Sequence, residues 1–496
     1  MNNLAELLVH RRERSPDARL GLLNAHERYA DVFDRAATVA AGFTAVGLGP
    51  GARVAVIGTN SMSYLVTWMA LQLAGIETAM VNPTYPADLL AEMLADLEPM
   101  AIVWVGPEPD LAVWSEAMHI DAGDAADQVL RIGDKTVPGV VPAVRFPGLH
   151  RQPLDVAGYM HTSGTTGTPK FCIQTHEYFL RLGRFIADSL GLSDTDTVLA
   201  PLPLFHINPL GYGVIGGLVA GASILSAERF SASRFWPDVR SNGVTALILH
   251  APPVEILKRA TTPADATGHE VRVVFFADAD FLTGFGIPLG VSAYGSTEAG
   301  GLCHVWTWRR GDPVDLPEGM SRYGGRSRHE VEWRVTRDGE IQVRADRPGV
   351  LFDGYLRRGE LVRPFDEDGW FATGDLGRID VAGNLVFIER RAESIRVKGE
   401  YIPIGFVEDH FARQAGLVDV AVWRQPSDLV DHEVALYVSG DALDIDAIRA
   451  ARAQLPSFMR PSVLFRVKEI PRDAGVGKIR RRQLADADVV ETVALA

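Results

Sequence analysis

Short apolar runs alternate with segments of helical periodicity through the first half of the chain. Apolar runs and helical periods follow one another at residues 52–58, 63–75, 78–83, 86–97 and 101–106. The alternation returns after residue 170 and continues to an apolar run at 271–276. Strands that alternate with helices predict a parallel sheet covered on both faces. We therefore expect an α/β fold with a large domain of doubly wound sheets.

The pattern changes at about residue 324. Short apolar segments such as 351–356 and 384–390 alternate there with Asp-Gly and Ala-Gly turns, which predicts a small antiparallel barrel over about 324–389. A basic patch and a compact α/β tail follow. We expect an N-terminal domain at 1–391 and a small, mobile C-terminal domain at 392–496.

Composition narrows the class of protein. The chain has 496 residues, 47% of them hydrophobic, which is enough for large cores. Its net charge of −14 repels nucleic acid and anionic membranes. The two cysteines are too few for a disulfide framework, the glycine-rich run 211–227 falls short of a membrane span, and the N-terminal segment 1–15 has no apolar run of signal-peptide length. We expect a cytoplasmic protein with no nucleic-acid partner and no stable membrane insertion.

The most informative segment is YMHTSGTTGTPK, residues 159–170. Backbone N–H groups in such a Gly-rich turn converge on an anion, the Ser and Thr hydroxyls add donors, and Lys170 adds a positive charge. A polyphosphate is the natural ligand. The spacing GxxGxPK differs from the GxxxxGK[ST] of P-loop proteins. A flexible Ser/Thr/Gly linker is the alternative, which the flanking apolar segments disfavour.

A second candidate site is YGSTEAG, residues 294–300, which follows a strand. The Thr297 hydroxyl can bind a phosphate oxygen, and the Glu298 carboxylate can hold the Mg²⁺ that accompanies ATP. The structural alternative is a helix N-cap followed by an acidic first turn.

Three later residues have the chemistry of nucleotide contacts. Asp375, in the turn of WFATGDLG, can accept hydrogen bonds from both ribose hydroxyls, although most TGD triplets are turns. Arg390 ends the strand NLVFIER and can meet ribose or phosphate, or be an ordinary surface arginine. Lys478 lies in the glycine-framed GVGKIRRR, where the alternative is a solvated basic face.

In this order, the segments resemble the adenylate-forming superfamily, which contains acyl-CoA ligases, peptide-synthetase adenylation domains and firefly luciferase. The resemblance covers nearly the whole chain. Its motifs are VGLGPGARVAVIGTN, TSGTTGTPK, PLPLFHINP at 201–209, YGSTE, TGDLGRID, ERRAESIRVKGEYI and GKIRRR. The ordered set is specific, although each motif alone is ordinary.

The resemblance implies an acid–thiol ligase. A carboxylate attacks the α-phosphate of ATP to give an acyl-adenylate and pyrophosphate, and a thiol, usually that of coenzyme A, then displaces AMP. The resemblance assigns the phosphate loop to Thr162, Ser163, Gly164, Thr165, Thr166, Gly167 and Lys170. It further assigns Tyr294 and Gly295 to the nucleotide, Thr297 to the α-phosphate and Glu298 to Mg²⁺. Asp375 and Arg390 are assigned to the ribose, and His206 to the acyl site. Lys478 is assigned to the carboxylate and α-phosphate, and the loop from Arg396 to Gly399 to the second step.

Three positions depart from the family's pattern. Ala392 stands where the hinge residue is usually Asp or Lys, and Phe171 where a glycine usually follows the loop lysine. Residues 277–293 offer too few positions for the family's full helix before YGSTE. The acyl pocket is therefore expected to be reshaped, or the site to be damaged.

The substrate class can be narrowed. Adenylation domains for amino acids carry an aspartate after the phenylalanine of the acyl-site motif, whereas this chain has Phe205-His206, so an α-amino acid is disfavoured. We expect a small carboxylic acid as substrate and ATP, Mg²⁺ and coenzyme A as its cosubstrates and cofactor. A ligase that loads an acyl carrier protein and a non-catalytic acyl-adenylate or nucleotide binder stay open as alternatives.

Overall fold

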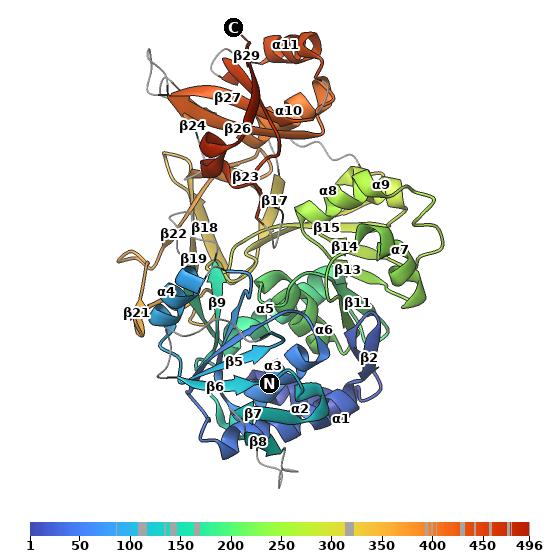
Figure 1. The fold of residues 1–496 in the computed structure, drawn as a ribbon, viewed down its shortest axis with the longest axis vertical. Coiled ribbons are helices and arrows are strands. Elements are labelled where there is room, and N and C mark those ends of the chain that lie inside the picture. The colour runs from blue at the N-terminus through green and yellow to red at the C-terminus, as the bar shows by residue number, and fades with distance from the viewer. Residues whose placement is uncertain are drawn as a thin grey trace. The chain divides into compact units, whose positions relative to one another are not determined.

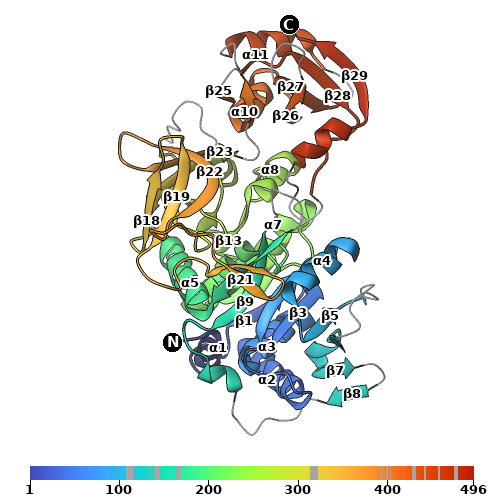
Figure 2. The same ribbon diagram turned by 90° about the vertical axis from the view of Figure 1, so that its left-hand side faces the viewer.

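The computed structural model is drawn in Figures 1 and 2. It describes residues 1–85, 87–107, 117–132, 135–138, 146–162, 169–312, 322–391, 395–397, 400–402, 404–426, 432–440, 443–455, 459–473, 477 and 479–495. Internal contacts divide the chain into two compact units. The first unit comprises Met1–Pro313, Arg326–Glu332 and Val343–Phe371, and the second comprises Val314–Gly325, Trp333–Gln342 and Ala372–Ala496. The boundary expected at residue 391 stays a prediction.

One sheet of the first unit, the N-terminal sheet, contains the first predicted strand–helix alternation. Its strands, in spatial order, are β21 (Glu360–Val362), β20 (Gly354–Arg357), β10 (Lys170–Thr175), β9 (Val156–Thr162), β4 (Glu77–Val81), β3 (Arg53–Gly58), β5 (Ala101–Val105), β6 (Met118–Asp121), β7 (Val129–Ile132) and β8 (Lys135–Pro138). The five from β9 to β6 are parallel, as the alternation predicts.

Helices cover both faces of the N-terminal sheet. In β3, Ala55 and Ile57 pack with helix α4 (Ala87–Leu97). Val54 and Val56 are equally buried and point to the opposite face, because successive side chains of a strand alternate. Helices α2 (Tyr29–Ala45) and α3 (Met62–Ala74) pack side by side in both ribbon views. The prediction of a doubly covered sheet is confirmed.

The other sheet of the first unit, the central sheet, carries the second alternation. In spatial order its strands are β16 (His304–Arg309), β15 (Leu289–Tyr294), β14 (Val273–Phe275), β13 (Ala246–Ile248), β11 (Thr197–Ala200), β12 (Ser223–Ser226), β1 (Arg19–Leu22) and β2 (Ala25–Arg28). Strands β15, β14, β13, β11 and β12 are parallel. The first unit also contains helices α1 (Leu4–Arg14), α5 (His176–Leu190), α6 (Gly216–Ala220), α7 (Ala232–Ser241), α8 (Ala251–Ala260) and α9 (Ala279–Phe285).

Two details concern the expectations for residues 277–293 and 351–356. The shortened segment before YGSTE forms α9, a two-turn helix whose N-cap Asp278 accepts the Phe281 N–H at 2.8 Å, so the crossover from β14 to β15 is complete. The stretch 351–356, expected in the antiparallel barrel, instead supplies β20, which pairs with the edge of β10 in the N-terminal sheet. A period-2 pattern identifies a strand but not its partner, which is why the sequence did not reveal this pairing.

Strands β18 (Val331–Val335), β19 (Glu340–Ala345), β22 (Phe371–Ile379), β23 (Leu385–Arg390) and β17 (Arg322–Ser327) are neighbours in that order. The second unit contains all of β23 and parts of the other four strands, because its bounds fall within β17, β18, β19 and β22. It also contains a sheet of its own. The C-terminal sheet has the order β26 (Asp419–Pro426), β27 (His432–Ser439), β28 (Val463–Val467) and β29 (Val489–Ala494), and helices α10 (Ile404–Gln414) and α11 (Ile445–Gln454) pack with it around a separate apolar core. Strand β24 (Ile395–Val397) pairs with β25 (Glu400–Ile402) in antiparallel register.

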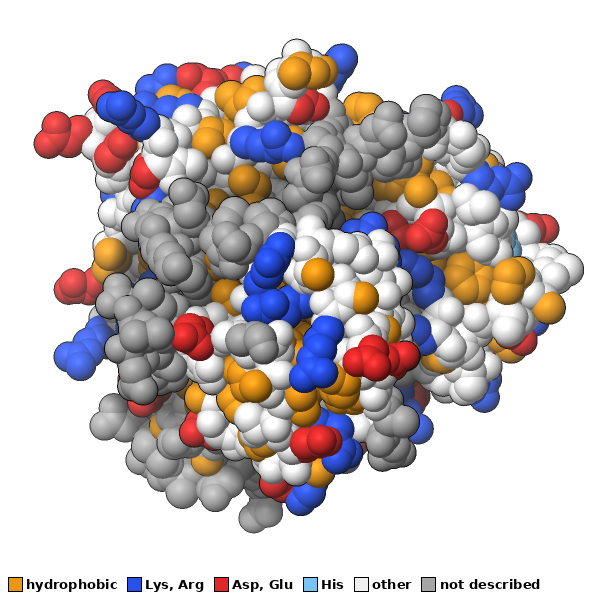
Figure 3. All heavy atoms as spheres, turned by 90° about the horizontal axis from the view of Figure 1, so that it is seen from above, with side chains coloured by type: hydrophobic (Ala, Val, Ile, Leu, Met, Phe, Trp, Pro, Cys, Tyr) orange, Lys and Arg blue, Asp and Glu red, His pale blue; other side chains and the backbone are white. Residues whose placement is uncertain are grey.

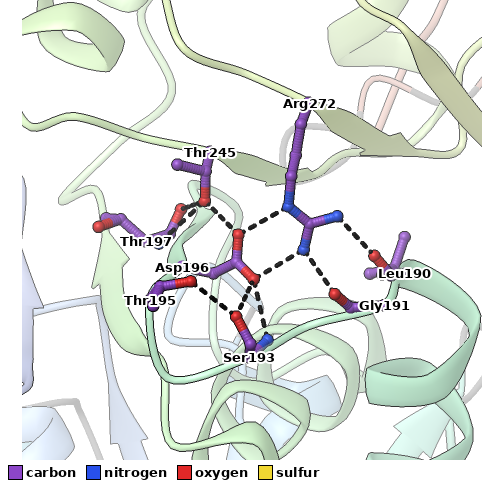
Figure 4. Close-up of polar contacts among 8 residues, drawn as sticks. All are labelled: Leu190, Gly191, Ser193, Thr195, Asp196, Thr197, Thr245 and Arg272. Carbon is purple, nitrogen blue, oxygen red and sulfur yellow. Dashed lines mark hydrogen bonds and ion pairs between the residues drawn. The ribbon is translucent and has the colours of Figure 1, made fainter.

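A polar network fixes α5 to the central sheet at the end opposite the strand carboxyl ends (Figure 4). The Asp196 carboxylate, with 4% of its side chain exposed, accepts bonds from Arg272 Nε at 2.8 Å and Arg272 Nη2 at 2.7 Å. It also accepts the Thr245 hydroxyl at 2.7 Å and the Ser193 N–H at 2.9 Å. The same guanidinium donates to the carbonyls of Leu190 and Gly191, which end α5, so one arginine satisfies a helix C-terminus and a buried carboxylate.

This network makes the stability dependent on pH. Burial raises the pKa of Asp196, but the hydrogen bonds from Arg272, Thr245 and Ser193 lower it by more than burial raises it. The net result is a pKa of about 2, below the ordinary value of an aspartate. Because this folded-state pKa lies below the ordinary value, the contribution of Asp196 to stability is complete above about pH 4 and is lost as pH falls through about 2.

We expect Asp196→Asn to lower the free energy of unfolding at pH 7 by about 1.5–3 kcal/mol, since it removes a charged acceptor. The difference from the natural protein should shrink between about pH 4 and pH 2, as measured by denaturant unfolding at several pH values. Asp238→Asn is the matched control, because the Asp238 carboxylate pairs with the exposed Arg234, and it should change stability by less than about 1 kcal/mol. A constant difference at every pH would contradict the account.

On the surface seen in Figure 3, acidic and basic side chains are interspersed among the described residues. The net charge of −14 is therefore not gathered into one acidic patch on the visible described part of this face. Among the described residues, no helix is both long and apolar enough to cross a membrane.

Candidate active site

Four neighbouring parallel strands of the central sheet end beside one another. The acyl-site motif at 201–209 follows β11, His250 follows β13 closely, Phe276 follows β14 directly, and YGSTE follows β15. In open α/β sheets, ligands bind outside the carboxyl ends of the strands. Segments that are distant in sequence are thus collected at one sheet edge, where a ligand site is expected.

Tyr355 brings the phosphate-loop lysine and the proposed metal ligand together. Its hydroxyl donates to Glu298 Oε1 at 3.2 Å, and Lys170 Nζ lies 5.0 Å from the centre of its ring. A cation and a carboxylate, 128 residues apart in numbering (298 − 170), are therefore held by one side chain. The contact is possible because β20 pairs with β10, which sets Tyr355 opposite Cys172.

The hairpin of β9 and β10 places Thr162 directly opposite Lys170 at the two ends of the phosphate loop. The other predicted loop residues, Ser163, Gly164, Thr165, Thr166 and Gly167, lie outside the described residues. Gly399, Lys478 and the predicted pivot Ala392 also lie outside them. Their roles stay predictions.

The turn after β15 depends on a glycine at position 295. A Cβ atom there would lie 2.3 Å from the Gly301 carbonyl oxygen and 2.7 Å from Leu302 Cα, so two backbone segments approach too closely for any side chain. The turn is held further by Tyr178, which donates its hydroxyl to the Thr297 carbonyl at 2.8 Å. Thr297 is 9% exposed. Tyr294 ends the strand that positions this turn.

Aromatic and imidazole rings surround the acyl-site motif. The Phe205 and His206 rings lie 4.6 Å apart, and the His161 ring lies 6.0 Å from Phe205 and 5.9 Å from His206. Tyr85 packs edge-on to His161 at 5.4 Å. The two sheets of the first unit meet here, since His161 belongs to β9 and Phe205 follows β11.

His250 and Phe276 form a second ring pair at the same sheet edge. Their rings stack 4.8 Å apart with an interplanar angle of 6°. Phe276 has φ of 68°, in the left-handed region that bulky side chains rarely adopt. Asn208, two residues after His206, donates to the Leu249 carbonyl at 3.0 Å and connects the acyl-site motif to this pair.

Cys172 is not a candidate nucleophile. Burial raises the pKa of its thiol well above the ordinary value, and the negative charge of Glu298 raises it further. Because the thiolate is the reactive form of cysteine, this side chain is an inert part of the core.

The second unit carries the predicted ribose residues. Asp375 in β22 lies opposite Arg390 in β23, and Arg390 Nε is 3.1 Å from Asp375 Oδ1. Asp375 is 3% exposed. The structure brings the two residues together as an ion pair, while their role toward ribose stays a prediction. Arg396 lies in β24, opposite Tyr401.

Sequence reasoning missed the contributions of Tyr355, Tyr178 and His161. Tyr355 lies in the stretch 351–356 that was expected in the antiparallel barrel, and its role depends on the unexpected pairing of β20. In the sequence, Tyr178 looks like an ordinary residue of a helix and His161 like an ordinary residue of a strand. Among the described residues no group of three or more His, Cys, Asp or Glu side chains is placed to hold a metal ion. The metal role of Glu298 stays a prediction.

Comparison with known families identifies the chain's relatives. The family described as AMP-binding enzyme matches residues 10–352. A medium/long-chain-fatty-acid–CoA ligase of Mycobacterium tuberculosis is 30% identical over 423 residues, covering 80% of this chain and 70% of that protein. An oxalate–CoA ligase of Arabidopsis thaliana is 27% identical and covers 98% of this chain and 97% of its own length.

Solved structures share the fold. The o-succinylbenzoate CoA synthetase MenE of Bacillus subtilis, solved with its acyl-adenylate intermediate, aligns with a TM-score of 0.82 and 21% identity over 99% of each chain. The ATP-bound MatB of Rhodopseudomonas palustris gives a TM-score of 0.81 and 23% identity over 98% of this chain and 99% of that one. These alignments confirm the predicted α/β architecture. With the family match across well over half of its length, the chain belongs to the AMP-binding, adenylate-forming enzymes.

Proposed function

We propose that the protein is an AMP-forming acyl-CoA ligase. It activates a small carboxylic acid with ATP and transfers the acyl group to coenzyme A. The observation that carries the proposal is the meeting of Lys170 and Glu298 at Tyr355, beside the carboxyl ends of four parallel strands. Such a site offers a cation for phosphate and a carboxylate for Mg²⁺. The CoA ligases among the relatives support the same reaction class.

In this proposal each described residue has one task. Lys170 binds the terminal phosphates as a point charge, and Thr297 binds an α-phosphate oxygen. The Glu298 carboxylate suits a Mg²⁺ that is otherwise held by phosphates and water, since this hard cation is commonly bound through one or two carboxylates. Mg²⁺ would neutralise charge on the triphosphate. Asp375 and Arg390 contact the ribose, and His206 contacts the acyl group.

The identity of the carboxylic acid substrate has to be found by a broad screen. The relatives are named for acids as different as medium- and long-chain fatty acids, oxalate and sulfoacetate. Phe205-His206 in the acyl-site motif disfavours α-amino acids, so amino acids serve as the expected negative set.

The test is ATP–pyrophosphate exchange over a panel of carboxylic acids, followed by addition of coenzyme A and mass analysis of the products. We expect acid-dependent exchange and a CoA thioester. Exchange without thioester, with acyl transfer to a phosphopantetheinylated carrier protein, would select the carrier-loading alternative. No exchange with any acid, combined with measurable nucleotide binding, would select the non-catalytic binder and overturn the proposal.

A further inference from the structure

Asn60 makes an unusually complete set of contacts with the segment that precedes the acyl-site rings. It lies between β3 and α3, and it is 4% exposed. Its Oδ1 accepts the Leu204 N–H at 2.8 Å, and its Nδ2 donates to the Leu202 carbonyl at 2.9 Å. Nδ2 also lies 2.8 Å from the Ala227 carbonyl and 3.1 Å from Ser226 Oγ.

These contacts engage both N–H groups of the Asn60 side-chain amide. The amide has two N–H donors and one carbonyl acceptor, and here three acceptors share the two hydrogens. Ser226 extends the network, because its hydroxyl donates to the Ala200 carbonyl at 2.9 Å. Asn60 therefore ties the ends of β11 and β12 in the central sheet to a loop of the N-terminal sheet. All partners lie in the first unit.

The consequence concerns His206. The backbone from Leu202 to Leu204 is clamped by Asn60, the His206 N–H then donates to the Pro203 carbonyl at 3.1 Å, and the Leu210 N–H donates to the His206 carbonyl at 3.3 Å. Leu210 lies in the π-helical segment Asn208–Ile215, a geometry found often at functional sites. The path of the chain into His206 is thus fixed on its N-terminal side by one side chain.

We propose that Asn60 is a positioning residue for the acyl site. It holds Leu202–Leu204 so that the Phe205 and His206 rings face the acid, without touching the acid itself. This inference depends on the proposed function for its catalytic consequence and on the hydrogen bonds alone for its structural consequence. The two consequences are tested separately.

The structural arm is hydrogen exchange of the backbone amides. In Asn60→Ala the Leu204 amide loses its acceptor, so we expect exchange over 202–210 to become about tenfold faster or more, the equivalent of one hydrogen bond of about 1.4 kcal/mol. Exchange in β3 should be unchanged. Ser226→Ala removes the hydroxyl that accepts from Asn60 and donates to the Ala200 carbonyl. It is a milder second variant if Asn60→Ala folds poorly. Unchanged exchange over 202–210 in both variants would overturn the proposal, whatever the enzyme's activity.

The catalytic arm uses an acid found active with the natural protein. Asn60→Ala should lower kcat/KM for the acid by about 10- to 100-fold, the range expected for misplacing a substrate-positioning group, and should change the KM for ATP by less than about twofold. Gln72→Met is the matched control. Gln72 is another buried amide, but it donates to Thr78 and Ala157 and not to the backbone of Leu202–Leu204, so the kinetic constants of Gln72→Met should stay near those of the natural protein.

A double-mutant cycle with His206→Ala completes the test. If Asn60 acts through His206, the double variant should lose no more kcat/KM than the worse single variant, because the second change removes an effect that the first has already removed. Multiplicative losses, or equal losses for the acid and for ATP, would overturn the positioning role and leave the proposed function standing. A natural protein that is inactive with every acid would instead overturn the proposed function, and hydrogen exchange alone would then decide the role of Asn60.

Discussion

Lys478→Ala is expected to abolish acid-dependent ATP–pyrophosphate exchange, with a loss of about 10²–10³ in rate, equal to about 2.7–4 kcal/mol. Adenylation brings two anions together, and a preorganised ammonium between the carboxylate and the α-phosphate stabilises that arrangement more strongly as the reaction proceeds. The same variant should still convert a supplied acyl-adenylate to the CoA thioester, because the resemblance assigns Lys478 to the first step and the loop from Arg396 to Gly399 to the second.

Lys468→Ala is the control for that experiment. Lys468 pairs with Asp488 at the surface, and both side chains are more than half exposed. Its removal should leave both half-reactions near the natural rates, since exposed ion pairs contribute little. Natural rates of exchange in Lys478→Ala would contradict the role assigned to the GKIRRR motif.

Glu298→Gln is expected to raise the Mg²⁺ concentration needed for half-maximal exchange by about tenfold or more. An amide lacks the charge that a hard cation favours, and two unit charges at contact interact by a few kcal/mol even at an effective dielectric constant near 20. Mg²⁺ titrations of the initial exchange rate measure the shift.

Tyr355→Phe separates the charge of Glu298 from its hydrogen bond. This variant removes the hydroxyl that donates to Glu298 but keeps the ring beside Lys170. The Mg²⁺ midpoint should stay close to that of the natural protein if the carboxylate charge is what matters. Superimposable titrations for Glu298→Gln and the natural protein would make Glu298 a structural residue.

The strand–helix alternation was readable because parallel strands buried on both faces leave continuous apolar runs. The run 52–58 became β3 and the helical period 63–75 became α3, each within one residue of the predicted bounds. The partner of β20 was not readable, because pairing depends on which sheet edge is open and not on local spacing. The contact between Lys170 and Glu298 through Tyr355 depends on that pairing.

The roles of single polar residues were harder to predict from the sequence than the strands and helices. Asn60 is a single polar residue between a strand and a helix, where a role as a turn residue or an N-cap is the ordinary interpretation. Only its four partners, from two separate segments, show that it holds the acyl-site motif. Asp196 is similar, since its partners Thr245 and Arg272 are brought to it by the parallel crossovers of the central sheet.

The most direct test of the central claim follows one oxygen atom. The active acid is labelled with oxygen-18 in its carboxylate and converted in full by the enzyme with ATP, Mg²⁺ and coenzyme A, and the nucleotide product is analysed by mass spectrometry. If the carboxylate attacks the α-phosphate and the thiol then displaces AMP, each AMP carries one heavy oxygen from the acid. Unlabelled AMP, or ADP with the heavy oxygen in inorganic phosphate, would contradict adenylate formation and with it the proposed ligase.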